Sequence, residues 1–309
     1  MKIERSWGWP IASYLFLGGL GSGIMVVSTL SDLFLGIGGI FAIGNFVAAI
    51  LVGLGSGLLV FDLGRPLYFW RVFSKENAIL TVGAWMLSLF IVIGIIYGSF
   101  WLPFLPWYGM EGLRVALAWV CLLIGLGVLI YTGVFLGTMK ARPFWNGPTL
   151  PVLFLVSGLS TGIATQALLV RFWPLGISSS AVAVVESFLR ASDIVLLVLE
   201  VVVLMLYVLT MRLSTTVFAA RAAATWLNGN KMLPFWGGIV VLGLVLPLVL
   251  YVMGNIITLI LAPLTVLVGG LILRFLVVYT DDRTLLPGEE KFYAGLPNDD
   301  EAFLHAWKE

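Results

Sequence analysis

The sequence has little charge for its length. Of its 309 residues, 11% are charged and 61% are hydrophobic, and the mean hydropathy is +1.08. Soluble globular proteins carry roughly 25% charged residues, so this composition excludes an ordinary soluble domain and a disordered chain. Because 17 Lys and Arg face 16 Asp and Glu, there is no basic surplus, and we expect no binding to nucleic acid.

Cysteine and histidine each occur once. Cys121 lies in an apolar run, which excludes an intrachain disulfide, a cysteine-rich zinc site and an iron–sulfur cluster held by this chain alone. His305 lies in a polar segment near the C-terminus, so a membrane-embedded haem with two histidine ligands is excluded as well. We therefore expect no haem, no iron–sulfur cluster and no metal site in this chain.

Long apolar runs dominate what is present. Eight of them reach the length of about 20 residues that a transmembrane helix needs. They run near 10–30, 34–60, 78–101, 113–139, 150–171, 187–211, 233–253 and 256–279. They lack the alternation of barrel strands. The sequence predicts an all-α polytopic membrane protein, with a transmembrane domain over 1–280 and a short polar tail over 281–309.

The charges divide between the two sides of the membrane. An even number of spans places both termini on one side, where we count 13 basic residues. The other side has Arg114, Arg171 and Arg190, and Arg274 lies inside the last span. The positive-inside rule then predicts cytoplasmic termini. The acidic segment 281–309 is either a solvated tail or a docking segment for a soluble partner.

Acidic residues within a span usually mark function, because a buried charge is costly in lipid. Glu186, Asp193 and Glu200 are spaced by seven residues, so they share nearly one helix face. They are candidates for proton transfer or for lining a wet cavity, with Arg190 four residues after Glu186 as a pairing partner. The alternative places Glu186 and Asp193 in the loop and the helix start.

Further polar groups lie at or within the predicted spans. Arg274 joins the candidates for proton transfer, and it could instead neutralise Asp62 at a similar depth. Asn45, Gln166 and Asn255 are expected to form hydrogen bonds between helices. Glycine pairs four residues apart, Gly19 with Gly23 and Gly53 with Gly57, predict close helix packing.

The loop after the second span reads D-L-G-R-P-L-Y-F-W-R-V-F, residues 62–73. Its arginines, Arg65 and Arg71, stand among aromatic residues that include Trp70. An aromatic belt at the membrane interface is one interpretation. The other is a docking surface for a protein partner, to which Arg142 on the same side is added.

Two tyrosines are expected at comparable depth on the side of the termini. Tyr14 lies about one turn inside the first span, and Tyr131 lies near the end of the fourth. Two phenols beside small residues are suited to donate hydrogen bonds to the carbonyl groups of a flat ligand. They are otherwise ordinary interfacial tyrosines.

Four blocks of the sequence resemble the NrfD/polysulfide-reductase family of membrane subunits. The first two are W-P-I-A-S-Y-L-F-L-G-G-L-G-S-G in the first span and the 62–73 loop. The third runs from Y-T-G at Tyr131 to S-T-G at Gly162, and the fourth is G-G-L-I-L-R-F-L-V-V-Y, residues 269–279. The blocks occur in the family's order and span most of the chain.

This resemblance implies two four-helix bundles and an exchangeable menaquinone or ubiquinone. We place the quinone near Tyr14 and Tyr131, with Asp62 and Arg65 setting the local charge. The resemblance also implies an iron–sulfur electron-transfer subunit and a molybdopterin-type catalytic subunit as partners. In the branch with a known quinone site, an Asn and a His contact the headgroup from the first helix. Ile11 and Tyr14 stand at those positions here.

The predicted function is that of a membrane anchor and quinone-reactive subunit of a respiratory oxidoreductase, with the acids as a proton route. In the polysulfide-reductase branch the quinone-proximal side is taken to face outward, whereas the charge count turns it inward here. The alternatives are a small-solute or ion transporter, and a structural anchor whose quinone site has decayed.

Overall fold

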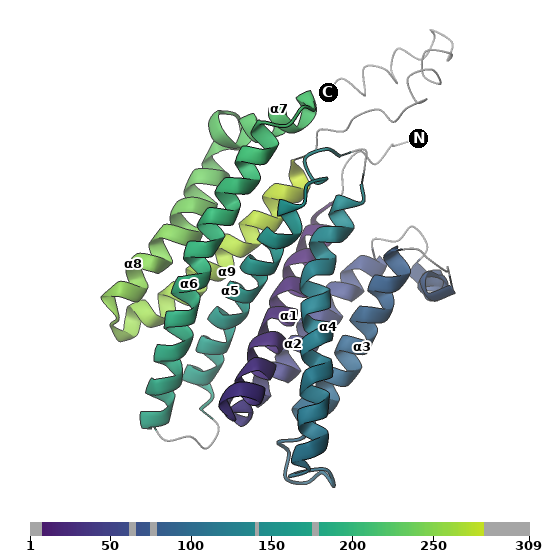
Figure 1. The fold of residues 1–309 in the computed structure, drawn as a ribbon, viewed down its shortest axis with the longest axis vertical. Helices are drawn as coiled ribbons and strands as arrows, with labels where there is room; N and C mark the ends of the chain where they lie inside the picture. The colour runs from purple at the N-terminus through teal and green to yellow at the C-terminus, as the bar shows by residue number, and fades with distance from the viewer. Residues whose placement is uncertain (1–7, 62–65, 75–78, 140–141, 175–178, 281–309) are drawn as a thin grey trace.

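The structure, a computed structural model, describes residues 8–61, 66–74, 79–139, 142–174 and 179–280. In these ranges all regular elements are helical, and eight segments are long and apolar enough to cross a membrane (Figure 1). The predicted all-α protein with eight spans is thus confirmed. The predicted tail lies outside the described residues, and the division at residue 280 stays a prediction.

Six of the eight spans are single α-helices, and two begin with a segment of another helical type. The spans are α1 (Trp9–Leu35), the 3-10 turn η1 (Gly38–Phe41) with α2 (Ala42–Phe61), α3 (Ile79–Ser99), α4 (Glu111–Gly137), α5 (Thr149–Phe172), α6 (Ser179–Arg212), the π-helix η3 (Leu233–Val245) with α8 (Leu246–Met253), and α9 (Ile256–Tyr279). Two short helices lie outside the spans: η2 (Pro66–Ser74) and α7 (Val217–Asn228).

Two predicted boundaries were wrong. The first span extends to Leu35, where Gly36 ends it with a φ of 68°, a conformation that glycine adopts without strain. The second span therefore begins at Gly38 rather than at residue 34. The sixth span begins at Ser179 rather than at residue 187, so Glu186 and Asp193 both lie within the helix. This excludes the alternative that placed them in a loop.

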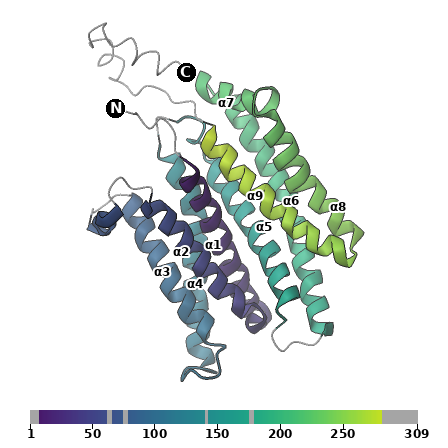
Figure 2. The ribbon, with the colours of Figure 1, turned by 180° about the vertical axis from the view of Figure 1, so that it is seen from behind.

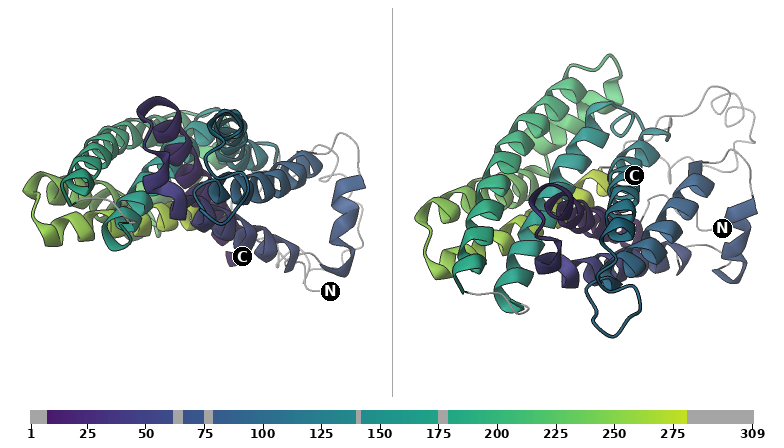
Figure 3. Two further views of the ribbon diagram at one scale, coloured as in Figure 1. Left: turned by 90° about the horizontal axis from the view of Figure 1, so that it is seen from below. Right: turned by 60° about the horizontal axis from the view of Figure 1, so that its bottom comes forward.

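The spans form two groups that meet along α1 and α5. In one group α1 contacts α2 and α4, and α3 packs between α2 and α4 (Figures 1 and 2). In the other group α5 contacts α6 and α9, and α9 contacts the η3–α8 span. Seen from below, α1 lies between the two groups (Figure 3). In α1, 78% of the most apolar stretch is buried, against 22% in α3, so α1 is a central helix.

Glycines explain why α1 and α5 are the central pair. A methyl group at Gly23 would overlap the backbone of Gly158, and one at Gly162 would overlap the backbone of Gly23. The two helices therefore touch through their main chains, as small residues at this spacing allow. The predicted packing is confirmed for Gly23 but is wrong for Gly57, which faces open space.

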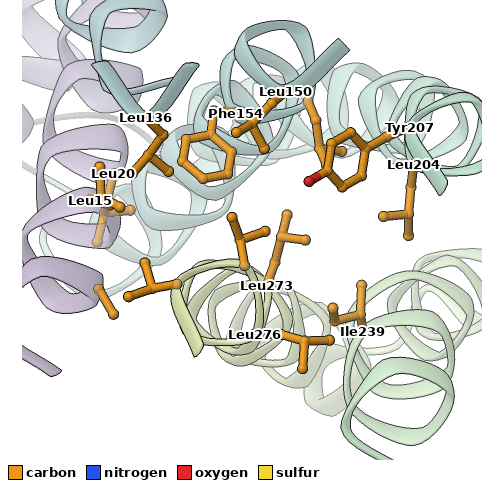
Figure 4. Packing of buried hydrophobic residues seen from close by; sticks show 14 of the residues in the cluster. Leu15, Leu20, Leu136, Leu150, Phe154, Leu204, Tyr207, Ile239, Leu273 and Leu276 are labelled. Atoms are coloured by element: carbon orange, nitrogen blue, oxygen red, sulfur yellow. The ribbon is translucent and has the colours of Figure 1, made fainter. Parts of the chain in front are cut away.

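Apolar side chains from both groups form one continuous core. Leu15 of α1 and Leu136 of α4 belong to the same cluster as Phe154 of α5 and Leu273 of α9 (Figure 4). On the side of the termini an aromatic cluster extends this core, where the Trp226 ring of α7 lies 5.0 Å from that of Phe144. This contact fixes α7, which lies between the sixth and seventh spans.

The two glycine positions allow a matched test of the α1–α5 contact. Gly23→Ala is expected to destabilise the protein by about 1–3 kcal/mol, because the added methyl group overpacks a backbone contact. Gly57→Ala is expected to be neutral or slightly stabilising, since its methyl group meets nothing. Thermal unfolding of both variants in the same detergent measures the difference. Equal midpoints would contradict the assigned contact.

Candidate functional site

Two buried phenols lie at the same depth on the side of the termini. Tyr14 of α1 is 2% exposed and Tyr131 of α4 is 8% exposed. They are close enough to interact electrostatically. Neither hydroxyl makes a hydrogen bond to another group in the described part of the protein. The structure thus brings together the two tyrosines that the sequence singled out, and it leaves their hydroxyl groups unengaged.

Small residues make room for these rings. A methyl group at Gly83 of α3 would overlap the phenol of Tyr131, so α3 approaches the ring only because this residue is glycine. On the other side, Gly18 lies between the Tyr14 ring and Thr132. Phe135 stacks on Tyr131 with ring centres 5.8 Å apart. The phenols are therefore held by packing on three helices.

The other residues expected at this site are only partly placed. Asp62 and Arg65 lie outside the described residues, so their part in the site stays a prediction. The same holds for the pairing of Asp62 with Arg274. Ile11 lies one turn before Tyr14 and is 9% exposed. It adds an apolar side chain, and no polar group, beside Tyr14.

A second set of polar residues lies between α5, α6, α8 and α9. Asp193 of α6 is fully buried and accepts two hydrogen bonds, from the Ser160 hydroxyl of α5 at 2.6 Å and from the Tyr251 hydroxyl of α8 at 2.7 Å. Both donors lie on neighbouring helices. A carboxyl group at this depth is thus satisfied by the protein itself, as burial in lipid requires.

Two turns further along α6, Glu200 lies near Ser157 of α5 and Arg274 of α9. The Ser157 hydroxyl oxygen accepts a hydrogen bond of 2.5 Å from Arg274. Arg274 also donates to the carbonyl of Phe154 at 3.3 Å and approaches Gly19 of α1. The polar set therefore reaches α1, the helix that carries Tyr14.

At the opposite end of α6, Glu186 pairs with Arg171 of α5. Two hydrogen bonds of 3.1 and 3.2 Å join them, and both side chains are partly exposed. The predicted pairing of Glu186 with Arg190 was wrong, because the tertiary contact to α5 replaces the contact within the helix. All three charged residues, with Tyr251, line a cavity of about 20 Å³, enough for one water molecule.

A third ionic group belongs to the α1–α4 half, and sequence reasoning missed it. Asp32 of α1 forms a salt bridge with Arg114 of α4 and accepts a hydrogen bond of 2.9 Å from Tyr97 of α3. Arg114 also lies over the ring of Trp101. Asp32 was missed because the predicted first span stopped at residue 30.

The residues expected to dock a partner differ in their exposure and in their contacts with the interior. In η2, Trp70 is exposed and Arg71 lies over the Tyr68 and Trp70 rings, at 4.7 and 5.6 Å from their centres. Arg142 instead lies 4.4 Å from the ring centre of Trp145, which is fully buried. The Trp70 and Arg71 pair is presented outward, whereas Arg142 is engaged with the interior. Arg65 lies outside the described residues.

Comparison with known proteins identifies the family. The profile of the family described as "Polysulphide reductase, NrfD" matches residues 1–285. The chain belongs to this family. It is 31% identical to a polysulfide reductase subunit of Wolinella succinogenes over 307 residues, which cover 88% of this chain and 93% of that protein.

Two further relatives carry the NrfD name. Protein NrfD of Escherichia coli is 29% identical, over 90% of this chain and 96% of that protein. A Protein NrfD homolog of Haemophilus influenzae is 26% identical, over 90% of this chain and 95% of that protein. This NrfD-family chain is therefore a multi-pass membrane protein of an oxidoreductase family, as the sequence blocks predicted.

Several polar residues of this NrfD-family chain had no distinguishing signal in the sequence. The hydroxyl groups of Ser160 and Tyr251 donate to Asp193, and that of Ser157 accepts from Arg274. Yet hydroxyl groups in membrane helices commonly bond to their own backbone. Thr161, for example, donates only to Ser157 and Gly158 carbonyls of its own helix. Only the positions of the neighbouring helices separate the connecting hydroxyls from the others.

Proposed function

We propose that this chain is the quinone-reactive membrane subunit of a multi-subunit oxidoreductase, and that menaquinone or ubiquinone binds beside Tyr14 and Tyr131. The observation that carries the proposal is the pair of neighbouring, largely buried tyrosines whose hydroxyl groups make no hydrogen bond within the described residues. Each hydroxyl group is therefore available to donate to a ligand. The carbonyl oxygens of a quinone are acceptors, and both tyrosine hydroxyl groups can donate hydrogen bonds to them.

A quinone takes up two electrons and two protons on reduction to a quinol, and it returns them on oxidation. In this proposal the Tyr14 and Tyr131 hydroxyls orient the headgroup and stand at the points where protons arrive or leave. The tyrosines act as hydrogen-bonded acid–base groups, resupplied by water or by a carboxylate. Asp62 and Arg65 are proposed to set the charge at the same end.

Electrons are proposed to pass to or from an iron–sulfur partner subunit, itself joined to a molybdopterin-type catalytic subunit. Trp70 and Arg71 of η2 form the proposed docking surface. This surface is coupled to the phenols through α3: the Thr81 hydroxyl donates to the Val72 carbonyl of η2 at 2.7 Å, and Gly83 lies against Tyr131 half a turn further. Docking and quinone binding would thus share one end of the molecule.

Protons are proposed to cross the membrane along the polar set in the α5–α9 half. The route begins at Glu186 and the small cavity beside Tyr251, continues through Asp193, and reaches Glu200 and Arg274. Arg274 lies against α1, less than two turns from Tyr14. The alternation of carboxyl and hydroxyl groups supports this route, since each can accept and donate a proton.

Replacing both phenols tests the quinone site. In the complex with its partner subunits, the double variant Tyr14→Phe with Tyr131→Phe is expected to lose quinone-dependent turnover, because both hydrogen-bond donors are removed. Turnover with an artificial electron acceptor is expected to remain. Steady-state assays with a soluble quinone analogue and a redox dye measure the two activities.

Tyr108→Phe serves as the matched control, because this tyrosine lies exposed in the loop before α4 at the opposite end. It should retain both activities. Full quinone-dependent turnover in the double variant would refute the site and favour a purely structural anchor.

Neutralising the buried acids tests the proton route. In proteoliposomes, Asp193→Asn and Glu200→Gln are each expected to abolish most of the membrane potential formed per quinone reduced, because an amide cannot relay a proton. A voltage-sensitive dye reports this quantity. Glu111→Gln, an exposed acid at the start of α4, is the control. An unchanged potential in both buried variants would show that protons take another path.

We also propose that the end of the molecule carrying the termini faces the cytoplasm, on the basis of the charge count. Cysteine labelling tests this orientation well, because Cys121 is the sole cysteine and is buried. In intact cells a membrane-impermeant maleimide is expected to label Met110→Cys but not Thr215→Cys, which lie in exposed loops at opposite ends. The reverse pattern would place the termini outside.

A further inference from the structure

Fully buried polar atoms without partners gather where α1, α2 and α5 meet. The Ser28 hydroxyl, both amide atoms of Asn45 and the amide oxygen of Gln166 make no hydrogen bond to any group within the described residues. All three side chains are 0% exposed. Buried polar atoms are nearly always hydrogen-bonded, to protein or to ordered water, so this concentration calls for a partner.

The register of α1 against α2 places Ser28 and Asn45 together. These helices are antiparallel, and a methyl group at Gly21 would meet the Ala48 carbonyl at 2.7 Å. Ser28 follows Gly21 along α1, and Asn45 precedes Ala48 along the antiparallel α2. Both lie on the same side of that contact, within about one helical turn of each other along the helix axes. Both therefore lie at one level of the interior.

Gln166 lies at the same level on the α5 side. Its amide nitrogen donates to the carbonyl of Ile24, one turn before Ser28, at 3.2 Å. Its amide group also packs against Gly44, the residue before Asn45. The unpartnered oxygen of Gln166 is thus adjacent to the same stretch of α1 and α2.

This polar level continues toward the end of the molecule opposite the termini. Asp32 lies one turn beyond Ser28 on α1, and a methyl group at Gly98, the residue after Tyr97, would lie 3.2 Å from the Cβ atom of Asn45. Tyr97 donates to Asp32. The side chain of Asp32 is 1% exposed and that of its partner Arg114 is 21% exposed, so the ionic group reaches from the interior to the surface.

An open cavity of about 580 Å³ lies at this same end. It is lined by the turn between α1 and α2 and by Trp101. The Trp101 ring contacts the Tyr97 ring, with centres 5.1 Å apart, and lies below Arg114. The described surface is therefore hollowed directly beside the ionic group.

We propose that ordered water molecules bind between Ser28, Asn45 and Gln166, and that this site is a water inlet from the end opposite the termini, entered past Arg114 and Asp32. The ligand is water because the unpartnered atoms include both donors and acceptors and carry no net charge. A bound water supplies both kinds of hydrogen bond and typically makes about three of them. The inlet enters through the α1–α4 half, borders α5 at Gln166, and is separate from the Asp193 route.

Its use as a proton source rests on the proposed function, because the same half carries Tyr14 and Tyr131. The presence of water does not depend on that function. The test is therefore chosen to detect water directly, without quinone turnover.

Brief radiolysis of water followed by mass spectrometry detects bound water, since the radicals oxidise side chains beside it. Met25 is the reporter: it is 0% exposed, lies one turn before Ser28, and is level with Asn45. In the full chain with its co-purifying subunits, Met25 is expected to be oxidised more than Met211, a methionine of the apolar cluster that is 6% exposed. Oxidation of Met25 at or below the level of Met211 would overturn the proposal.

Two adjacent hydroxyl groups provide matched variants. Ser28→Ala removes an unpartnered hydroxyl and is expected to lower the oxidation of Met25. Thr29→Val removes a buried hydroxyl that already donates to the Met25 and Val26 carbonyls, at 2.9 and 3.0 Å, and is expected to leave the oxidation unchanged. Asn45→Leu is the stronger variant. Equal labelling in the Ser28 and Thr29 variants would contradict the assignment.

Mixing with ¹⁸O-labelled water before radiolysis tests the connection to the surface. The heavy oxygen is expected in oxidised Met25 at the shortest mixing times, because the inlet exchanges with bulk water. Incorporation only after long incubation would show trapped water and overturn the inlet. If instead the tyrosine variants keep full quinone activity while Met25 is still labelled, the proposed function fails and the water site stands.

Discussion

The contact between the backbones of α1 and α5 joins the two halves of this membrane protein. Gly23 meets Gly158 and Gly162 without any intervening side chain, and this brings the axes of two spans close together. Lipid offers no hydrophobic gain for helix association, so such contacts depend on fit. Because α1 carries Tyr14 and α5 carries Ser157, the same contact sets the phenols and the buried charges side by side.

The polar groups of the interior fall into two classes, those with hydrogen-bond partners within the protein and those without. Asp193 receives hydrogen bonds from two helices, and Glu200 lies near Arg274, which donates a hydrogen bond to Ser157. Tyr14 and Tyr131, by contrast, make no hydrogen bond through their hydroxyl groups within the described residues. In a medium that offers no hydrogen bonds, satisfied groups serve structure or relay, whereas unsatisfied groups mark places where something else binds.

The two ends of the molecule are built differently. On the side of the termini, exposed aromatic residues and Arg71 lie on η2, and the aromatic cluster around Trp226 fixes α7. At the other end, charges are paired across helices, as Arg171 with Glu186 and Arg114 with Asp32. An end with exposed aromatic and basic side chains suits a protein partner, whereas an end with paired charges beside an open cavity suits contact with water.

Much of this architecture could be read from the sequence, because lipid imposes a simple rule on length and hydropathy. The number of spans, the depth of Tyr14 and Tyr131, and the shared face of Asp193 and Glu200 all follow from helical geometry. The start of α6 did not, because serines and Glu186 interrupt the apolar residues of its first turns, as they would in a loop. The pairing of Glu186 with Arg171 did not either, since contacts four residues apart compete with contacts between helices.

The sequence alone determined that the chain is a helical membrane bundle, because composition and run length decide what lipid accepts. It also determined the family, through four ordered blocks. Only the tertiary structure decided which polar groups find partners. Ser28 and Thr29 are neighbouring hydroxyls in one helix, yet only Ser28 is left without a partner among the described residues, because partners are set by side-chain direction and by the register of adjacent helices.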